Sequence, residues 1–153
     1  MKVIVIGPRG KMGKLITQVA AERDDMELVA GVAPAGRDYV GQDLGMVALI
    51  GRNLGVPVVD DLAAVIDGCD VIIDFSTREN ALKVLDLAVK HGKALVCGTT
   101  GFSEEEFARF KEAAKTIPML YAANTSKLVN IMNKLLEMVT KTLGEDADIE
   151  ILE

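Results

Sequence analysis

The chain has 153 residues, 50% of them hydrophobic and 26% charged, which is enough to bury one hydrophobic core and excludes an intrinsically disordered protein. Its formal net charge is −6, and acidic and basic residues are interspersed, so the sequence lacks the basic surface that nucleic-acid binding requires. No apolar run approaches the roughly 18 residues of a membrane span and the short N-terminal run is unlike a signal peptide, so we expect a cytoplasmic protein with no membrane partner.

The order of the predicted elements indicates an α/β fold. Short apolar runs alternate with longer amphipathic stretches, which is typical of parallel strands joined by crossover helices. The predicted strands cover residues 3–6, 27–32, 56–59, 71–73, 94–97, 118–121 and 149–152. The predicted helices cover residues 12–23, 60–66, 77–91, 103–115 and 127–143. We expect a Rossmann-type, doubly wound and mostly parallel sheet in a domain of residues 1–126, followed by a C-terminal helix and short strand over 127–153.

Two helices have apolar faces that predict which residues they bury. The first helix is expected to pack through Leu15, Ile16, Val19 and Ala20. The last helix begins after Ser126, which can cap it, and ends at Gly144. Its apolar residues form one stripe: Leu128, Ile131, Met132, Leu135, Met138, Val139 and Leu143. This stripe is expected to be core or, in part, an interface with another copy of the chain.

The connections also carry signals. Residues 34–55 contain five glycines and little periodicity, which predicts a long loop with room for one helical turn. Pro57 limits the strand around it because proline cannot donate to a ladder. Ser103, followed by three glutamates that end at Glu106, predicts a capping box at a helix start. Gly92 is the expected stop of the helix that precedes it.

The residue types that most often carry catalysis or bind metals are scarce. Cys69 and Cys97 have no histidine or cysteine at ligand spacing, so we interpret them as reduced core cysteines rather than a zinc site. His91 is the one histidine and lies at a predicted helix C-terminus, where a structural or surface role is favoured. We therefore name no catalytic residue and no metal ligand.

The strongest motif is the glycine loop Gly7-Pro8-Arg9-Gly10-Lys11-Met12-Gly13. It follows the first strand and opens the first helix, so its backbone N–H groups lie at a helix N-terminus, where they suit a pyrophosphate. The spacing is G-x-x-G-x-x-G, which is weak by itself, but its place in a strand-loop-helix unit indicates a dinucleotide-binding site. The alternative is a tight turn without a ligand.

The residue at the end of the second strand bears on cofactor choice. Dinucleotide sites usually place an acidic residue there to accept from the adenosine ribose hydroxyls. Ala33 occupies that position and Arg37 follows closely. Without a carboxylate there is no repulsion of a 2′-phosphate, and Arg37 could pair with one, so the sequence favours NADPH over NADH. A solvated, unengaged Arg37 remains the alternative.

Four segments together resemble one enzyme family. They are the glycine loop, residues 74–77 (Asp-Phe-Ser-Thr), residues 98–102 (Gly-Thr-Thr-Gly-Phe) and residues 122–124 (Ala-Ala-Asn). In order and spacing they resemble the cofactor half of dihydrodipicolinate reductase (4-hydroxy-tetrahydrodipicolinate reductase), a family of oxidoreductases in lysine and diaminopimelate biosynthesis. The resemblance runs nearly end to end.

The resemblance implies a role for each segment. The glycine loop would hold the pyrophosphate, and Gly98, Thr99 and Thr100 would meet the nicotinamide ribose. The stretch Ala122-Ala123-Asn124-Thr125 would lie under the nicotinamide. Phe75 and Ser76 would line the same crevice. The alternative interpretation is that Phe75 is a buried core ring and that Ser76 caps a helix. All of these segments follow predicted strands, as dinucleotide contacts do.

Three departures from the family pattern are visible. Ala33 stands where the family usually has an acidic residue. Leu128 stands where the family's hinge has a glycine, which favours a continuing helix over a flexible turn. The family's Asp-Ile-Glu-Ile-Ile-Glu strand matches residues 148–153, whereas its His-His-x-x-Lys motif and a later Ser-Gly-Thr, which protonate and bind substrate, have no counterpart in this sequence.

Two functions follow as hypotheses. The first is an NAD(P)H-binding domain of a dihydrodipicolinate-reductase-like oxidoreductase that binds cofactor without turnover by itself; in the family, hydride passes from the nicotinamide to a cyclic imine dicarboxylate. The second is a non-catalytic α/β scaffold or self-associating module whose last helix and strand pack against another copy. A different small amino-acid dehydrogenase with the same glycine loop is a further, less favoured alternative.

Overall fold

The chain divides into two units, Met1–Ala122 and Ala123–Glu153, and the computed structural model describes residues 1–150. Each unit is described by itself. No helix among the described residues is long and apolar enough to cross a membrane.

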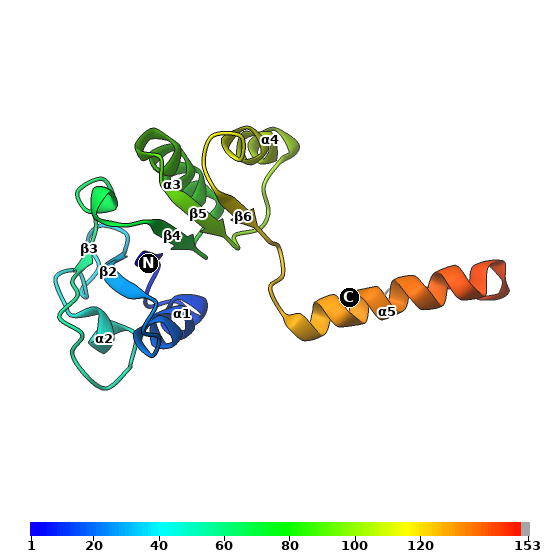
Figure 1. Cartoon of the computed structure of the whole chain (residues 1–153), viewed down its shortest axis with the longest axis horizontal. Helices are drawn as coiled ribbons and strands as arrows, with labels where there is room; N and C mark the ends of the chain where they lie inside the picture. Colours follow the sequence, from blue (N-terminus) through cyan, green and yellow to red (C-terminus); the bar gives the residue numbers. More distant parts are fainter. Residues whose placement is uncertain (151–153) are drawn as a thin grey trace. The chain divides into compact units, whose positions relative to one another are not determined.

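The first unit is built on a parallel sheet with the strand order β3-β2-β1-β4-β5-β6 within the described residues (Figure 1). The strands are β1 (Lys2–Ile6), β2 (Glu27–Val32), β3 (Val58–Val59), β4 (Val71–Asp74), β5 (Ala94–Cys97) and β6 (Met119–Tyr121). All of their pairings are parallel. The chain runs outward from β1 to β3 and then returns to β4 on the other side of β1, so the α/β, Rossmann-type fold is confirmed.

Helices fill the crossovers between these strands. They are α1 (Lys11–Ala21), α2 (Leu44–Val47), the 3-10 turn η1 (Ile66–Gly68), α3 (Arg78–His91) and α4 (Glu104–Ala113). Ser103 and Glu106 form the expected capping box of α4, and Gly92 ends α3 with a φ of 62°. The single turn α2 lies in the long glycine-rich connection, as predicted.

The predicted helix over residues 60–66 is wrong. Residues 63–65 form a turn that continues into η1, and Cys69 ends η1 by donating its Sγ–H to the carbonyl of Ile66 at 3.2 Å. The segment is too short to propagate an α-helix, and burial of Leu62 and Ile66 holds it in place instead.

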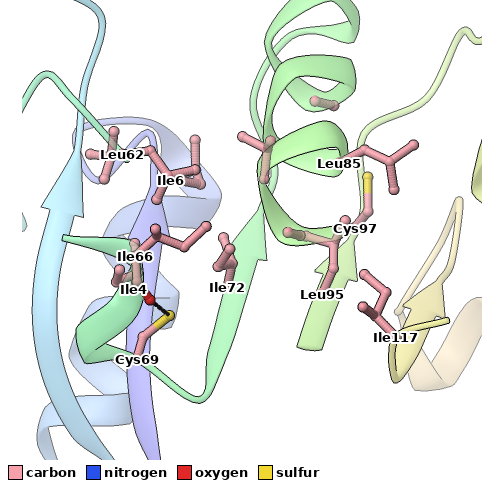
Figure 2. Packing of buried hydrophobic residues seen from close by; sticks show 14 of the residues in the cluster. Ile4, Ile6, Leu62, Ile66, Cys69, Ile72, Leu85, Leu95, Cys97 and Ile117 are labelled. Carbon is pink, nitrogen blue, oxygen red and sulfur yellow. Dashed lines mark hydrogen bonds between the residues drawn. The ribbon is translucent and has the colours of Figure 1, made fainter. Parts of the chain in front are cut away.

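The core lies on both faces of the sheet. Ile4, Ile72 and Leu95 form the centre of one face (Figure 2), where α3 and α4 contribute buried side chains to the same cluster. Val3 and Val5 form the other face and pack against Ile16 of α1. Strands buried on both faces explain their continuous apolar sequences. The cysteines are free and buried, as expected.

The expected inner face of α1 is partly wrong. Leu15 and Val19 are 55% and 57% exposed, and the buried residues are Gly13, Thr17 and Ala20. These small residues bring α1 close to the sheet, and the Thr17 hydroxyl is satisfied by donating to the carbonyl of Gly13 at 2.7 Å. Hydrophobicity alone points to the larger side chains, whereas close packing after the glycine loop selects the small ones.

The second unit contains α5 (Lys127–Leu143) and the 3-10 turn η2 (Gly144–Asp146). Ser126 caps α5 by accepting from the N–H of Val129 at 3.4 Å, and Leu128 is helical, as expected. Within this unit no residue of α5 is buried, so its apolar stripe forms no core among the described residues. Ile149 and Glu150 are not in a strand; the rest of that predicted strand, 151–152, lies outside the described residues.

Candidate functional site

The glycine loop forms a tight turn between β1 and α1. Gly7 has a φ of 67°, a backbone conformation that favours glycine, and its carbonyl accepts from the N–H of Gly10 at 3.0 Å. A Cβ added at Gly13 would lie 2.1 Å from the Gly7 carbonyl oxygen, so only glycine allows this packing. A Cβ at Gly10 would lie 3.2 Å from the same oxygen.

This geometry fits a pyrophosphate. Gly10 is the N-cap of α1 and supplies no side-chain acceptor to the first helical N–H groups. Those groups are therefore available to an anion at the positive end of the helix dipole. The absence of a side chain at Gly10 lets a phosphate approach the backbone.

A cleft of about 730 Å³ lies beside the loop. It runs past the carboxyl ends of four neighbouring strands, β1, β2, β3 and β4, in the region where the strand order reverses. It is lined by Ile6, Gly7, Gly10, Val32, Ala33, Pro34, Ala35, Arg37, Tyr39, Asp60, Asp61, Leu62, Phe75, Ser76, Thr77, Asn80, Lys83, Val84 and Leu87. Such a switch point is where open α/β sheets bind ligands.

The segment after β2 is held to the glycine loop by Arg9. Its guanidinium donates to the Asp38 carboxylate at 2.8 Å and lies 4.9 Å from the centre of the Tyr39 ring. Arg9 is therefore occupied within the protein and lines a smaller hollow outside the cleft. Arg37, by contrast, lines the cleft and is exposed.

The loops after β4 and β5 are joined by Asp74. This carboxylate is fully buried and accepts from the N–H of Ser76 at 3.1 Å and from the hydroxyl of Thr99 at 3.3 Å. Burial raises the pKa of Asp74, and these hydrogen bonds oppose the rise. Burial likewise raises the pKa of the neighbouring Cys97 thiol to about 11, so Cys97 is a protonated core residue.

The ring of Phe75 leaves no space for a side chain at Gly98. A Cβ added at Gly98 would lie 2.0 Å from that ring, and Phe75 itself lines the cleft together with Ser76. The two predicted contact segments, 74–77 and 98–102, are thus packed on each other. Thr99 is buried, whereas Thr100 is exposed.

The other predicted site residues fall into three groups. Pro8 is buried and Gly13 is packed under the Gly7 carbonyl, while Lys11 and Met12 are exposed at the start of α1. Ala122 ends the first unit and donates its N–H to the carbonyl of Cys97 at 3.1 Å. Ala123, Asn124 and Thr125 belong to the second unit, where the Asn124 side chain accepts from the N–H of Ser126 at 2.8 Å.

Several cleft residues were not among the predicted site residues. They are Tyr39, Asp60, Asp61, Asn80 and Lys83. Asp60 and Asp61 come directly after a predicted strand, and that position could have marked them. Tyr39 lies in the long loop, and Asn80 and Lys83 lie on α3; only tertiary packing brings them to the cleft.

Comparison with known proteins assigns the family. The family model described as dihydrodipicolinate reductase, N-terminus, matches residues 1–125. The chain belongs to the dihydrodipicolinate reductase family. The resemblance seen in the sequence is therefore confirmed, and the matching part is the N-terminal part of the family.

Individual relatives agree with this assignment. The chain is 46% identical over 153 residues to the 4-hydroxy-tetrahydrodipicolinate reductase of Geobacter metallireducens and 41% identical over 152 residues to that of Hahella chejuensis. It covers 57% of each relative's length. A solved dihydrodipicolinate reductase from Paenisporosarcina, bound to dipicolinate, matches with a TM-score of 0.74 and 26% identity over 92% of this chain and 53% of that one.

A more distant structure shows the fold alone. The apo scyllo-inositol dehydrogenase of Lactobacillus casei matches with a TM-score of 0.66 at 18% identity, over 90% of this chain and 41% of that one. The fold of this chain is thus shared with a protein of low sequence identity.

Proposed function

We propose that residues 1–126 form the NAD(P)H-binding domain of a reductase of lysine and diaminopimelate biosynthesis, which acts in the cytoplasm. The observation that supports this most directly is the cleft at the switch point of the sheet, with Gly7 and Gly10 in its wall. When bound there, the nicotinamide would supply a hydride. The residues of this chain would bind the dinucleotide and orient it.

We propose further cofactor contacts, which follow the family resemblance; among these residues only Gly7 and Gly10 line the cleft. The glycine loop would hold the pyrophosphate, and Gly98, Thr99 and Thr100 would position the nicotinamide ribose through the loop that Asp74 anchors. Residues Ala122, Ala123, Asn124 and Thr125 would lie under the nicotinamide. The chain spans 57% of the length of the Geobacter metallireducens relative. Residues 1–153 by themselves are therefore expected to bind cofactor without reductase turnover.

Titration of NADPH and NADH tests this proposal. A ligand that binds only the folded state stabilises it by about 2.7 kcal/mol at one hundred times its Kd. The midpoint temperature of thermal unfolding should therefore rise, and nicotinamide fluorescence should increase on binding. Gly10→Ala is the matched control, because it adds one methyl where a phosphate approaches and should abolish the shift while the protein remains folded. Absence of any shift with either nucleotide at millimolar concentration would refute the proposal.

We propose that NADPH is preferred to NADH. Ala33 lines the cleft without a charge, and Arg37 lines it as an exposed cation, so Arg37 would attract a 2′-phosphate that no carboxylate at position 33 repels. Replacement Ala33→Asp should weaken NADPH relative to NADH by about 1–3 kcal/mol. Isothermal titration with both nucleotides measures the ratio, Ala33→Asn controls for size, and an unchanged ratio in the Asp variant would contradict the assignment.

A second candidate function is self-association through α5. The residues of its apolar stripe are 44% to 76% exposed, and a contiguous exposed apolar surface is typical of an interaction site. Sedimentation should show a dimer or larger species that Leu135→Glu dissociates, whereas Asn133→Glu, on another face of α5, should leave it intact. A monomer at all concentrations would exclude this module.

A further inference from the structure

Asp60 is the first residue after β3 and lies at the same edge of the sheet as the end of β2. The two strands are parallel, with Val59 opposite Val32, and the N–H of Ala33 donates to the carbonyl of Val59 at 2.9 Å. Asp60 therefore comes directly after Val59, the residue that Ala33 contacts. Ala33 and Asp60 both line the cleft. The carboxylate that is missing after β2, at Ala33, is thus present after the neighbouring strand β3, at Asp60.

The two adjacent carboxylates differ in what they already bind. Asp61 accepts from the N–H of Ala63 at 2.9 Å and so closes a local turn. Asp60 is exposed and, among the described residues, has no hydrogen bond or ion pair. Its acceptor oxygens are therefore available to a group in the cleft.

We propose that Asp60 accepts a hydrogen bond from an adenosine ribose hydroxyl and thereby determines how strongly the cleft discriminates against the 2′-phosphate. This inference rests on the proposed NAD(P)H-binding function. A ribose hydroxyl can donate to a carboxylate, whereas a 2′-phosphate carries negative charge and is repelled by it. Asp60 and Arg37 line one cleft and act in opposite directions, so cofactor preference is the balance of the two.

The magnitude of the effect follows from exposure. Asp60 and Arg37 are both exposed, so solvent screens each of them. Removing the Asp60 carboxylate should weaken NADH about threefold, through the lost hydroxyl contact, and tighten NADPH about threefold, through the lost repulsion. The ratio of the two dissociation constants should then change about tenfold toward NADPH.

The test compares the parent chain with Asp60→Ala, Asp60→Asn and Asp61→Asn, using NADH and NADPH as probes in isothermal titration. Asp60→Ala should change the ratio about tenfold, and Asp60→Asn, which keeps an acceptor without a charge, should tighten NADPH while weakening NADH less. Asp61→Asn keeps the acceptor for the Ala63 N–H and should change the ratio less than half as much. Thermal unfolding without nucleotide verifies that each variant is folded.

Two outcomes would overturn the inference by itself. One is an unchanged ratio in Asp60→Asn when the parent chain binds nucleotide; the other is an equal change in Asp61→Asn, which would reveal general electrostatics rather than a contact. If the parent chain binds neither nucleotide, the proposed function fails and the role of Asp60 fails with it. Low salt should enlarge the tightening of NADPH in Asp60→Asn, because charge repulsion is screened by ions.

Discussion

Asp74 combines full burial with three hydrogen-bond partners, one in the loop after β4, one in the loop after β5 and one at the end of β5 itself. Its oxygens accept from the N–H of Ser76, the hydroxyl of Thr99 and the thiol of Cys97. Replacement by alanine removes the acceptor of the Ser76 N–H and leaves the Thr99 hydroxyl only the Ser76 carbonyl at 3.4 Å, so we expect Asp74→Ala to lower the free energy of unfolding by about 1–3 kcal/mol and to weaken cofactor binding. Urea unfolding and nucleotide titration measure the two effects, and a variant with parent-like affinity would show that the loops are held by other contacts.

The same residue gives a pH dependence with a defined sign. Burial raises the pKa of Asp74 in the folded state, so the folded protein retains a proton that the unfolded chain has released. Stability should therefore decline as the pH rises from about 4, the ordinary aspartate pKa, through the raised value, and remain constant above it. In Asp74→Asn this decline should be absent, and its persistence would assign the slope to another group.

Gly98 and Phe75 test how closely the cleft loops are packed. Because a Cβ at Gly98 would lie 2.0 Å from the Phe75 ring, Gly98→Ala should cost about 1–3 kcal/mol of stability through overpacking. The loss should shrink when Phe75 is first replaced by alanine, since the clash is then removed. A double-mutant cycle by urea unfolding measures this coupling, and additive losses would contradict the contact.

At the scale of elements, Asp43 organises the long connection after β2. Its carboxylate accepts from the backbone N–H groups of Gly45, Leu54, Gly55 and Val56. Burial alone would raise the pKa of Asp43, but these donors outweigh it, so the pKa is lowered. One side chain thus caps α2 and closes a loop whose sequence looks irregular.

Removing this carboxylate should loosen the connection. Asp43→Ala is expected to cost about 1–2 kcal/mol. Because the folded pKa is lowered, the contribution of Asp43 is present above the ordinary aspartate pKa of about 4 and is lost as the pH falls through the folded value. Urea unfolding between pH 3 and pH 6 should show a shallower acid-side loss in Asp43→Ala than in the parent chain; parallel curves would argue against this role.

Elements with local signals could be predicted, and those without them could not. The capping box at Ser103 and the stop at Gly92 depend on neighbouring residues, so the sequence contains the whole signal. The α1 face was misassigned in part: Ile16 and Ala20 pack as predicted, whereas Leu15 and Val19 are exposed and Gly13 packs against Gly7. Lys83 and Asn80 could not be predicted as cleft residues, because helical periodicity does not indicate which strand ends a helix faces.

At the level of the whole molecule, the first unit is expected to fold and to bind the adenosine part of the cofactor without the second. Residues 1–122 contain the sheet, its core and the cleft, so a chain ending at Ala122 should unfold cooperatively and bind ADP-ribose with an affinity within about twofold of the parent chain. NADPH should bind it more weakly if Ala123, Asn124 and Thr125 contact the nicotinamide. Calorimetry with both ligands tests this, and loss of ADP-ribose binding would show that the second unit supports the adenosine end.

Local patterns were sufficient to predict the order of the sheet strands, the long helices, the place of the glycine loop and the family, because periodicity, caps and short motifs are local properties. The tertiary structure decided which residues share the cleft. Ala33 and Asp60 are adjacent only because β2 and β3 pair in register, and Asp74 joins Ser76 to Thr99 only because β4 and β5 are neighbours. Such contacts depend on strand pairing between distant segments, which no local pattern encodes.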